Sequence, residues 1–285
     1  MKENEVSTGA TYSVETDGKT GLRRMTVSMG GGCPVGCAYC YTYDPKFQGY
    51  PRRNADQIVD ELTRRVDEFD ILQWGCDTEP FLPKNKEITL SSLERIARMK
   101  KHISFATRFV LTDGEIDRVA SVAQTMKADQ KFLAGFHSYL GRRAIAELEP
   151  HAPSADERLD GMRRLYNAGI FTFIFIRPLL PTITDQELDG IIAETKNHCH
   201  GHVVGEVFYR DSVDGVTSPN RQRKHIDLGL VSPTRQGASM SFGPDTGDWN
   251  VFADPRIQRL VGQHENVFAH SSEVFPFLAE KFPSN

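Results

Sequence analysis

Six short apolar runs recur along this sequence, and most of them are rich in β-branched or aromatic residues. Runs of this kind predict strands, which we place at residues 22–29, 71–76, 103–109, 132–137, 171–178 and 202–210. Between the runs, apolar residues return at every third or fourth position, as at Ile58, Leu62 and Val66. That spacing puts them on one face of a helix. It predicts helices at residues 54–69, 91–101, 115–126, 155–168 and 185–198.

The predicted strands are continuous apolar runs, without the alternation of a strand that has one face in water. Strands of this kind are buried on both faces, as in parallel sheets covered by right-handed crossover helices. A strand followed by a helix, repeated six times, predicts the α/β class and a partial TIM-like (β/α)6 barrel. Such barrels gather functional residues at the carboxyl ends of the strands, so we look for chemistry in the segments that follow each strand.

We expect three parts along the chain. Residues 1–21 are polar and predict an N-terminal arm, and residues 22–210 carry the six strand and helix units. The remaining part, 211–285, opens with a long connection at 211–250 that is rich in Gly, Pro, Ser and charge, which predicts a lid loop. Closing elements follow: a short strand and two helices, at residues 266–269, 254–261 and 272–281.

Composition narrows the class of protein only a little. Of the 285 residues, 39% are hydrophobic and 25% are charged, which is ordinary for a soluble enzyme. The net charge of −4 provides no overall field that would attract nucleic acid. No apolar run approaches the roughly 20 residues that a membrane span needs, and the polar N-terminus lacks the apolar core of a signal peptide. We therefore expect a cytoplasmic protein that does not enter a membrane.

The strongest chemical signal is the stretch CPVGCAYC, which follows the first predicted strand. It places Cys33, Cys37 and Cys40, three of the five cysteines, in the spacing CxxxCxxC. One short loop with this spacing can wrap three thiolates around three irons of a [4Fe-4S] cluster and leave the fourth iron without a protein ligand. The glycines around the cysteines suit such a loop, because glycine lets the backbone pass close to a cluster and adopt positive φ.

Three alternatives compete with a catalytic cluster. A structural zinc site needs four protein ligands, usually in two separated pairs, and no second CxxC or HxxxH follows. A disulfide suits three clustered cysteines poorly, and nothing in the sequence indicates an oxidising compartment. The third alternative is an iron-sulfur protein with a structural or redox-sensing role. The histidines around Cys199 could suggest a second metal, but after the first cluster only Cys76 and Cys199 remain as thiols, so we expect a solvated turn there.

The cysteine motif resembles the signature of the radical S-adenosylmethionine (SAM) enzymes, and Tyr39 stands where that family usually has an aromatic residue. The resemblance implies a (β/α)6 barrel and a [4Fe-4S] cluster whose open iron is chelated by the amino and carboxylate groups of SAM. It also implies an electron donor of the flavodoxin or ferredoxin type. Reductive cleavage of SAM would yield methionine and a 5'-deoxyadenosyl radical, which abstracts hydrogen from the substrate.

Further motifs narrow the resemblance to the spore photoproduct lyase-like branch, over about residues 22–210. They are CDTEP at 76–80 with Glu87, LEPHAP at 148–153 with Arg158, and Arg177-Pro178 with Pro181 and Asp185. The resemblance implies that Cys76 donates a hydrogen atom to the substrate radical and that Tyr39 and Tyr41 help return the radical to SAM. The thiol chemistry agrees, since an S–H bond is weaker than most C–H bonds. A buried structural cysteine and two packing tyrosines are the alternative.

Contacts to SAM are expected from residues that end other strands. Thr78 and Glu79 stand where the family meets the amino group of SAM, and His137 and Ser138 end the fourth strand. Arg177 ends an apolar strand and is costly to bury unpaired, so it should meet an anion: the SAM carboxylate, a substrate group or Glu206 on the next strand. The segment 149–158 is better explained as architecture, in which Ser154 and Glu157 form a helix capping box.

The substrate is less well defined than the cofactor chemistry. Resemblance to spore photoproduct lyase implies repair of a thymine lesion in DNA, with the lesion flipped out to the active face of the barrel. The mildly acidic charge and the lack of a recognisable DNA-reading element argue against a simple transfer of that activity. The alternative is a biosynthetic enzyme that acts on a small molecule, a nucleoside or a peptide.

Overall fold

The computed structural model describes residues 14–27, 29–40, 52–75, 78–212, 215–217, 250–252 and 254–283. The strands of its main sheet are β1 (Val14–Thr16), β2 (Arg23–Val27), β3 (Ile71–Trp74), β4 (His102–Thr107), β5 (Leu133–Ser138), β6 (Phe171–Ile176), β7 (Gly201–Val204) and β11 (Val267–Phe268). The helices are α1 (Ala55–Arg64), α2 (Lys86–Ile96), α3 (Asp113–Lys127), α4 (Arg142–Leu148), α5 (Ala155–Asn167), α6 (Asp185–Thr195), α7 (Pro255–Gln263) and α8 (Val274–Lys281). Short 3-10 turns lie at Val66–Glu68, Ala97–Met99 and Ser271–Glu273.

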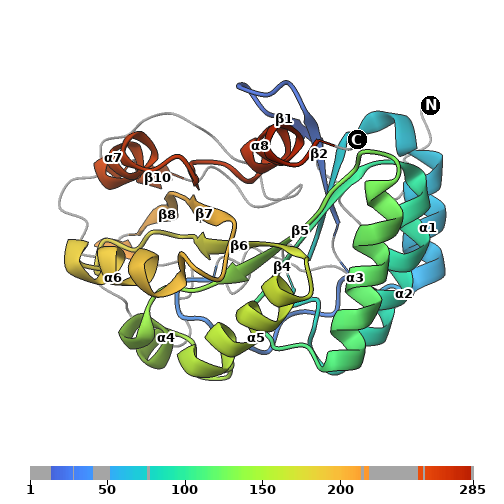
Figure 1. Ribbon diagram of the computed structural model, residues 1–285. Coiled ribbons are helices and arrows are strands. Elements are labelled where there is room, and N and C mark those ends of the chain that lie inside the picture. The colour runs from blue at the N-terminus through green and yellow to red at the C-terminus, as the bar shows by residue number, and fades with distance from the viewer. Residues whose placement is uncertain are drawn as a thin grey trace, which may run out of the picture.

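The main sheet has the strand order β1-β2-β3-β4-β5-β6-β7-β11. β1 pairs with β2 in the antiparallel sense, and every other neighbouring pair is parallel. The sheet curves without closing, and helices α1 to α6 lie along one of its faces (Figure 1). This arrangement confirms the predicted partial TIM-like barrel. The predicted closing strand, β11, adds a seventh parallel strand beside β7.

Strand alternation separates an outer, helix-covered face from an inner face. On the outer face, Trp74 and Phe105 belong to a buried cluster with residues of α1, α2 and α3. On the inner face, Phe136 and Phe173 pack in another cluster with Phe275 of α8. α8 therefore fills the inside of the sheet next to β1 and β2 (Figure 1), where the sequence predicted a closing helix.

Four helices begin at capping boxes, in which the N-cap side chain and the side chain three residues later bond each other's backbone N–H. Their N-cap residues are Asn54, Thr112, Ser154 and Thr184. The box at Ser154 is the one predicted from the sequence. Because these caps fix where α1, α3, α5 and α6 begin, they also fix the end of each loop on the carboxyl edge of the sheet.

Two helices differ from the sequence prediction. α2 begins at Lys86, before the predicted residue 91. The first turn was not predicted because it contains Thr89, a polar residue that the fold buries completely. The Thr89 hydroxyl donates to the carbonyl of Pro80 at 2.7 Å and accepts from the indole of Trp74 at 3.2 Å. α4 was not predicted; it is short and begins at Gly141 without a side-chain cap.

The last predicted strand, 202–210, is two strands. β7 ends at Val204, and β8 (Val207–Ser212) pairs with β9 (Gly215–Thr217) and β10 (Asn250–Phe252) in a separate antiparallel sheet. Gly205 marks the break: its N–H donates to Ile176 and its carbonyl accepts from Leu179. The predicted lid loop lies mostly outside the described residues. Among the described residues, no helix has the length and apolar character to cross a bilayer.

Candidate functional site

The loop with the three motif cysteines leaves β2 at the carboxyl edge of the parallel strands. Its backbone has positive φ at four glycines, Gly30, Gly31, Gly32 and Gly36, with values from 67° to 78°. These values lie in a region that residues with a Cβ rarely occupy. The loop is tied to the far half of the barrel, because Ala38 N–H donates to the carbonyl of Leu148 at 2.8 Å.

The three motif cysteines form no disulfide, and the charges of Cys33 and Cys40 act on the thiol of Cys37. Burial raises the pKa of Cys37 to about 12, and the nearby charge of Arg108 opposes that rise. Burial also raises the pKa of Cys33, whose sulfur is approached by the backbone N–H groups of Val35 and Glu79. A buried thiol becomes a thiolate when a metal replaces its proton. The glycine backbone and the three soft donors therefore fit an iron-sulfur cluster.

Among the described residues, no three His, Cys, Asp or Glu side chains converge on one point as the ligands of a single metal ion do. The thiolates of a cubane cluster do not meet at a point, because each binds a different iron. The lack of a single-ion site therefore does not count against a cluster at the motif loop.

Thr78 and Glu79 follow β3 and pack against the motif loop. The Thr78 hydroxyl donates to the carbonyl of Gly32 at 3.0 Å. The Glu79 carboxylate is only 3% exposed and accepts from the backbone N–H groups of Arg108, at 2.9 Å, and Phe81, at 3.2 Å, and from the Thr107 hydroxyl. Burial raises its pKa, although these donors act in the opposite direction. Both side chains thus hold the loops together.

Tyr39 is 8% exposed and belongs to a buried network between the motif loop, β4 and α5. Its hydroxyl donates to the Glu149 carboxylate and accepts from Arg108 Nη2 at 3.0 Å. Glu149 also pairs with Arg108, at 3.4 Å, and with Arg158. Arg158 Nη1 donates to the carbonyl of Ser138 at 3.0 Å. Segment 149–158, for which we expected a structural role, therefore contacts Tyr39, the residue between two motif cysteines.

His137 and Ser138 end β5 on opposite faces of the sheet. The register pairs His137 with Ile174 on the helix-covered face and Ser138 with Phe175 on the inner face. His137 is 2% exposed and Ser138 is 4% exposed, and the side-chain polar atoms of both lack a hydrogen-bond partner. Burial, and then the charge of Arg158, lower the pKa of His137 to about 4, so its imidazole is neutral.

Arg177 follows β6 on the inner face, next to Gly205. A Cβ built on Gly205 would stand 2.6 Å from Arg177 Cδ, so the glycine makes room for the arginine stem. Ser138 and Arg177 therefore come from neighbouring strands of the inner face. Cys76 and Tyr41, expected in the radical relay, lie outside the described residues.

Sequence reasoning missed Arg108, which the structure brings to Tyr39 and Glu149. A signal for it was available, because Arg108 directly follows the apolar strand β4 in the same way that Arg177 follows β6. A guanidinium at the buried end of a strand requires a partner.

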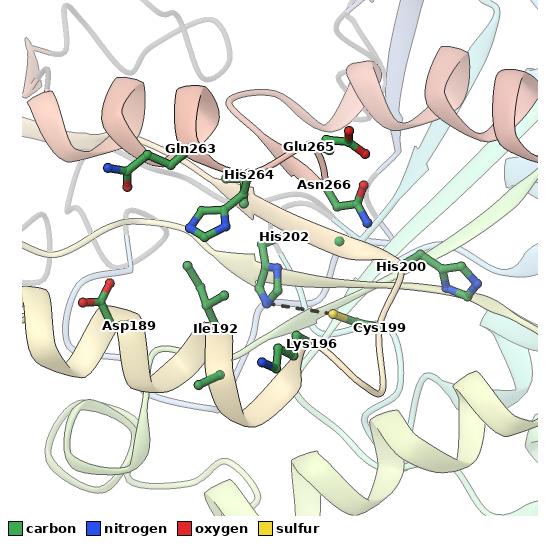
Figure 2. Close-up of a pocket in the computed structure, with 13 residues that line it drawn as sticks. Asp189, Ile192, Lys196, Cys199, His200, His202, Gln263, His264, Glu265 and Asn266 are labelled. Atoms are coloured by element: carbon green, nitrogen blue, oxygen red, sulfur yellow. Dashed lines mark hydrogen bonds between the residues drawn. The ribbon is translucent and has the colours of Figure 1, made fainter.

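A pocket of about 600 Å³ opens on the helix-covered side of β7, between α6 and residues 263–267 (Figure 2). Within it, His202 Nε2 lies 2.7 Å from Thr195 Oγ1 and 3.9 Å from Cys199 Sγ. Burial lowers the pKa of His202 to about 4. The pocket surrounds the amino end of β7, at the edge of the sheet opposite the motif loop, and is separate from the candidate site.

Sequence comparison identifies one family and one relative. Residues 27–194 match the family model of the radical SAM superfamily. An uncharacterized protein of Methanocaldococcus jannaschii is 28% identical over 174 residues, which cover 58% of this chain and 63% of that protein. The match thus spans less than two thirds of the relative's length.

Comparison with solved structures supports the same fold. A cysteine-to-serine mutant of spore photoproduct lyase superimposes with a TM-score of 0.63 at 15% identity, over 96% of this chain and 78% of that one. The same enzyme complexed with dinucleoside spore photoproduct gives a TM-score of 0.58. Streptococcus suis SuiB bound to SAM gives 0.52 at 13% identity, over 68% of this chain and 42% of that one. With a family model that covers more than half of its length, the chain belongs to the radical SAM superfamily.

Proposed function

We propose that Cys33, Cys37 and Cys40 hold a [4Fe-4S] cluster at which SAM is reductively cleaved, and that the enzyme acts on a thymine lesion in DNA. The observation that carries the first part is the glycine-rich loop after β2, which brings the three motif cysteines, none of them in a disulfide, to the carboxyl edge of the sheet. The similarity to spore photoproduct lyase over 96% of this chain supports the second part.

When bound, the cluster supplies the electron that cleaves SAM to methionine and a 5'-deoxyadenosyl radical, which takes hydrogen from the substrate. The chain's own residues bind and orient the reactants. Ser138 and Arg177 offer a hydroxyl and a guanidinium from the inner face, suited to the ribose and the carboxylate of SAM. Thr78 and Glu79 order the edge of the loop where the amino group of SAM is expected.

Cys76, Tyr39 and Tyr41 form the proposed hydrogen relay. Cys76 gives its S–H hydrogen to the carbon radical of the substrate, and a tyrosine O–H then gives a hydrogen atom to the cysteine sulfur. The buried Tyr39 hydroxyl is held by Glu149 and Arg108, so Tyr41 is the tyrosine proposed to exchange with Cys76 directly. Each transfer moves one hydrogen atom and leaves the total number of unpaired electrons unchanged.

A second candidate is a radical SAM enzyme that acts on a small molecule, a nucleoside or a peptide. The net charge of −4 favours this candidate, because DNA binding relies on cationic contacts to phosphate. The similarity to SuiB, one structure of which is bound to a precursor peptide, favours it too. Binding to a lesion-bearing duplex separates the two candidates, since phosphate contacts weaken steeply as salt rises.

The first experiment is anaerobic reconstitution with iron and sulfide, followed by addition of dithionite and SAM. Dithionite stands in for a cellular donor of the flavodoxin or ferredoxin type. We expect a full cubane complement of iron and formation of 5'-deoxyadenosine, and we expect neither in a variant with all three motif cysteines changed to Ala. A loaded wild-type protein that leaves SAM intact both with and without lesion DNA would contradict the proposed activity.

The second experiment presents the loaded enzyme with dinucleoside spore photoproduct and, separately, with a duplex that carries the lesion. We expect thymine to be restored in at least one of these substrates, with 5'-deoxyadenosine formed or SAM regenerated. SAM cleavage without lesion reversal would retain the radical chemistry and would favour the second candidate substrate class.

A further inference from the structure

Four side chains form a continuous network beside the motif loop, which is buried except for part of Arg108: Tyr39, Arg108, Glu149 and Arg158, called the Tyr39 network below. The side chains of Glu149 and Arg158 are 0% and 1% exposed, and that of Arg108 is 23% exposed. Arg108 reaches the Tyr39 oxygen at 3.0 Å, and its guanidinium lies 5.9 Å from the centre of the Tyr39 ring. Tyr39 stands directly before Cys40 in the sequence. The network therefore holds its charges next to the cysteine motif.

The Tyr39 network carries an excess of positive charge. Burial tends to raise the pKa of Glu149, but Arg108 and Arg158 outweigh it, and the pKa of this carboxyl is lowered. The network then holds two guanidinium cations against one carboxylate. Arg108 donates to the hydroxyl of Tyr39, the residue directly before Cys40. The network therefore places this cation beside the motif loop.

An iron-sulfur cluster at this loop would gain one electron when it is reduced. A fixed cation nearby favours the form with the extra electron, and a fixed anion disfavours it. Such charges act strongly when they are buried, because little water screens them. Groups beyond the direct ligands commonly tune metal sites in this way. The opposite charges of Arg108 and Glu149 predict opposite effects on the same reduction.

We propose that Arg108, anchored by Tyr39 and Glu149, raises the reduction potential of the cluster bound at Cys33, Cys37 and Cys40. The role rests on the proposed function, which places the cluster at these cysteines. Arg108 is a positioning residue with an electrostatic effect; it is not a ligand and does not touch the substrate. Glu149 holds the guanidinium in place and partly offsets its charge.

The test is a redox titration of the reconstituted protein without SAM, followed by electron paramagnetic resonance of the reduced cluster. Arg108→Gln removes the cation and should shift the midpoint potential to a more negative value. Glu149→Gln removes the anion, keeps a group of the same size, and should shift the potential to a more positive value. Opposite shifts are the signature of an electrostatic effect, since a merely loosened loop has no reason to give them.

Three control variants separate charge from structure. Arg108→Lys retains the charge and should keep the potential closer to the wild-type value than Arg108→Gln does. Tyr39→Phe removes a neutral hydroxyl and should shift the potential less than either charge variant. Arg118→Gln makes the same change of net charge at an exposed ion pair with Glu87 and Glu94, and should leave the potential unchanged. Iron content and circular dichroism are measured on every sample.

Shifts in the same direction for Arg108→Gln and Glu149→Gln, or potentials equal to wild type in loaded variants, would overturn the inference. If Arg108→Gln does not retain its cluster, Glu149→Gln still gives the sign, because it removes a charge from the same network. Failure of the proposed function would look different, because the wild-type protein would then form no cluster or would not cleave SAM. A wild-type enzyme that cleaves SAM while these variants keep its potential refutes only the role of Arg108.

Discussion

The Thr78 hydroxyl donates a 3.0 Å hydrogen bond to the carbonyl of Gly32, which joins the segment after β3 to the loop after β2. Thr78 is 5% exposed, and Gly32 directly precedes Cys33. The bond therefore holds the backbone at the first motif cysteine. A loop with positive φ at several glycines gains little rigidity from its own residues, so it depends on contacts of this kind.

Thr78→Val removes this hydroxyl and keeps the shape of the side chain. We expect a loss of about 1 kcal/mol in the free energy of unfolding, and lower iron content after reconstitution because the Gly32 carbonyl loses its donor. Urea unfolding and iron analysis measure the two effects. Thr78→Ser restores the donor and is the matched control. Equal iron content in the Val and Ser variants would show that the bond does not order the loop.

Replacing any one of Cys33, Cys37 and Cys40 with Ala should prevent assembly of the full cubane cluster, because each thiolate binds a different iron. Cys199→Ala is the control, since Cys199 likewise forms no disulfide but lies at the opposite edge of the sheet. Iron and sulfide analysis together with the visible absorbance of the cluster measure the result. A motif variant with the same cluster content as Cys199→Ala would mean that the motif has been misread.

The strands could be predicted from the sequence because each is a short apolar run that the fold buries on both faces. Elements with buried polar residues cannot be predicted from an apolar pattern in this way. Thr89 obscures the first turn of α2 in the sequence, since its hydroxyl group bonds the Pro80 carbonyl and the Trp74 indole, partners that only the folded chain supplies. The break after β7 was missed for a similar reason: Gly205 is required by the Arg177 side chain, which comes from another strand.

The residues of the candidate site are also of two kinds: some are close together in the sequence, and others are brought together only by folding. The motif cysteines lie within eight residues, so their chemistry can be read directly from the sequence. The Tyr39 network joins residues that are 69 positions apart, from Tyr39 to Arg108, and 110 positions apart, from Tyr39 to Glu149. No local pattern specifies such a set. The inner-face position of Ser138 and the outer-face position of His137 follow from strand register, which becomes certain only when the strand ends are known.

Gly205→Ala should destabilise the fold, because the added Cβ would stand 2.6 Å from Arg177 Cδ. We expect a loss of about 1–3 kcal/mol in the free energy of unfolding, typical of overpacking, and weaker SAM binding if Arg177 is displaced. Gly190→Ala is the matched control, since Gly190 lies in α6 with nothing within 4 Å of its added Cβ. Chemical denaturation measures the stability of both variants, and a binding titration measures their affinity for SAM. Equal stability of the two variants would contradict the close approach of Arg177 to Gly205.

Cys76→Ala should leave the cluster intact and SAM cleavage active while normal product is lost or diverted. The reason is chemical: without the S–H donor, the substrate radical has to find another source of hydrogen. Chromatography of 5'-deoxyadenosine and of the substrate-derived product on one sample gives the ratio of SAM cleaved to product formed, which should rise. Cys199→Ala is again the control. Normal product at a normal rate from Cys76→Ala would remove this cysteine from the relay.

Stability should fall in mild acid because three histidines are buried in neutral form. Burial is the main cause that lowers the pKa of His102, His137 and His202 to about 4, from an ordinary value of 6.5. Between pH 6.5 and 4, the unfolded chain therefore binds more protons than the folded chain, and stability rises with pH. Near pH 5 the free energy of unfolding should change by about 3 kcal/mol per pH unit from these three groups. Their contribution levels off as the pH rises through the unfolded value of 6.5 and is constant from about one pH unit above it.

The contribution of one histidine can be isolated at His137, whose ring nitrogens have no hydrogen-bond partner. His137→Leu removes a group that must lose its proton on folding, so the slope near pH 5 should fall by about 1 kcal/mol per pH unit. Urea titrations of the apoprotein at several pH values measure the slope, with the exposed His151→Leu as the matched control. Because burial of an unsatisfied imidazole is costly, His137→Leu should also be at least as stable as wild type at pH 5. An unchanged slope would mean that His137 gains a partner in solution that keeps its charged form.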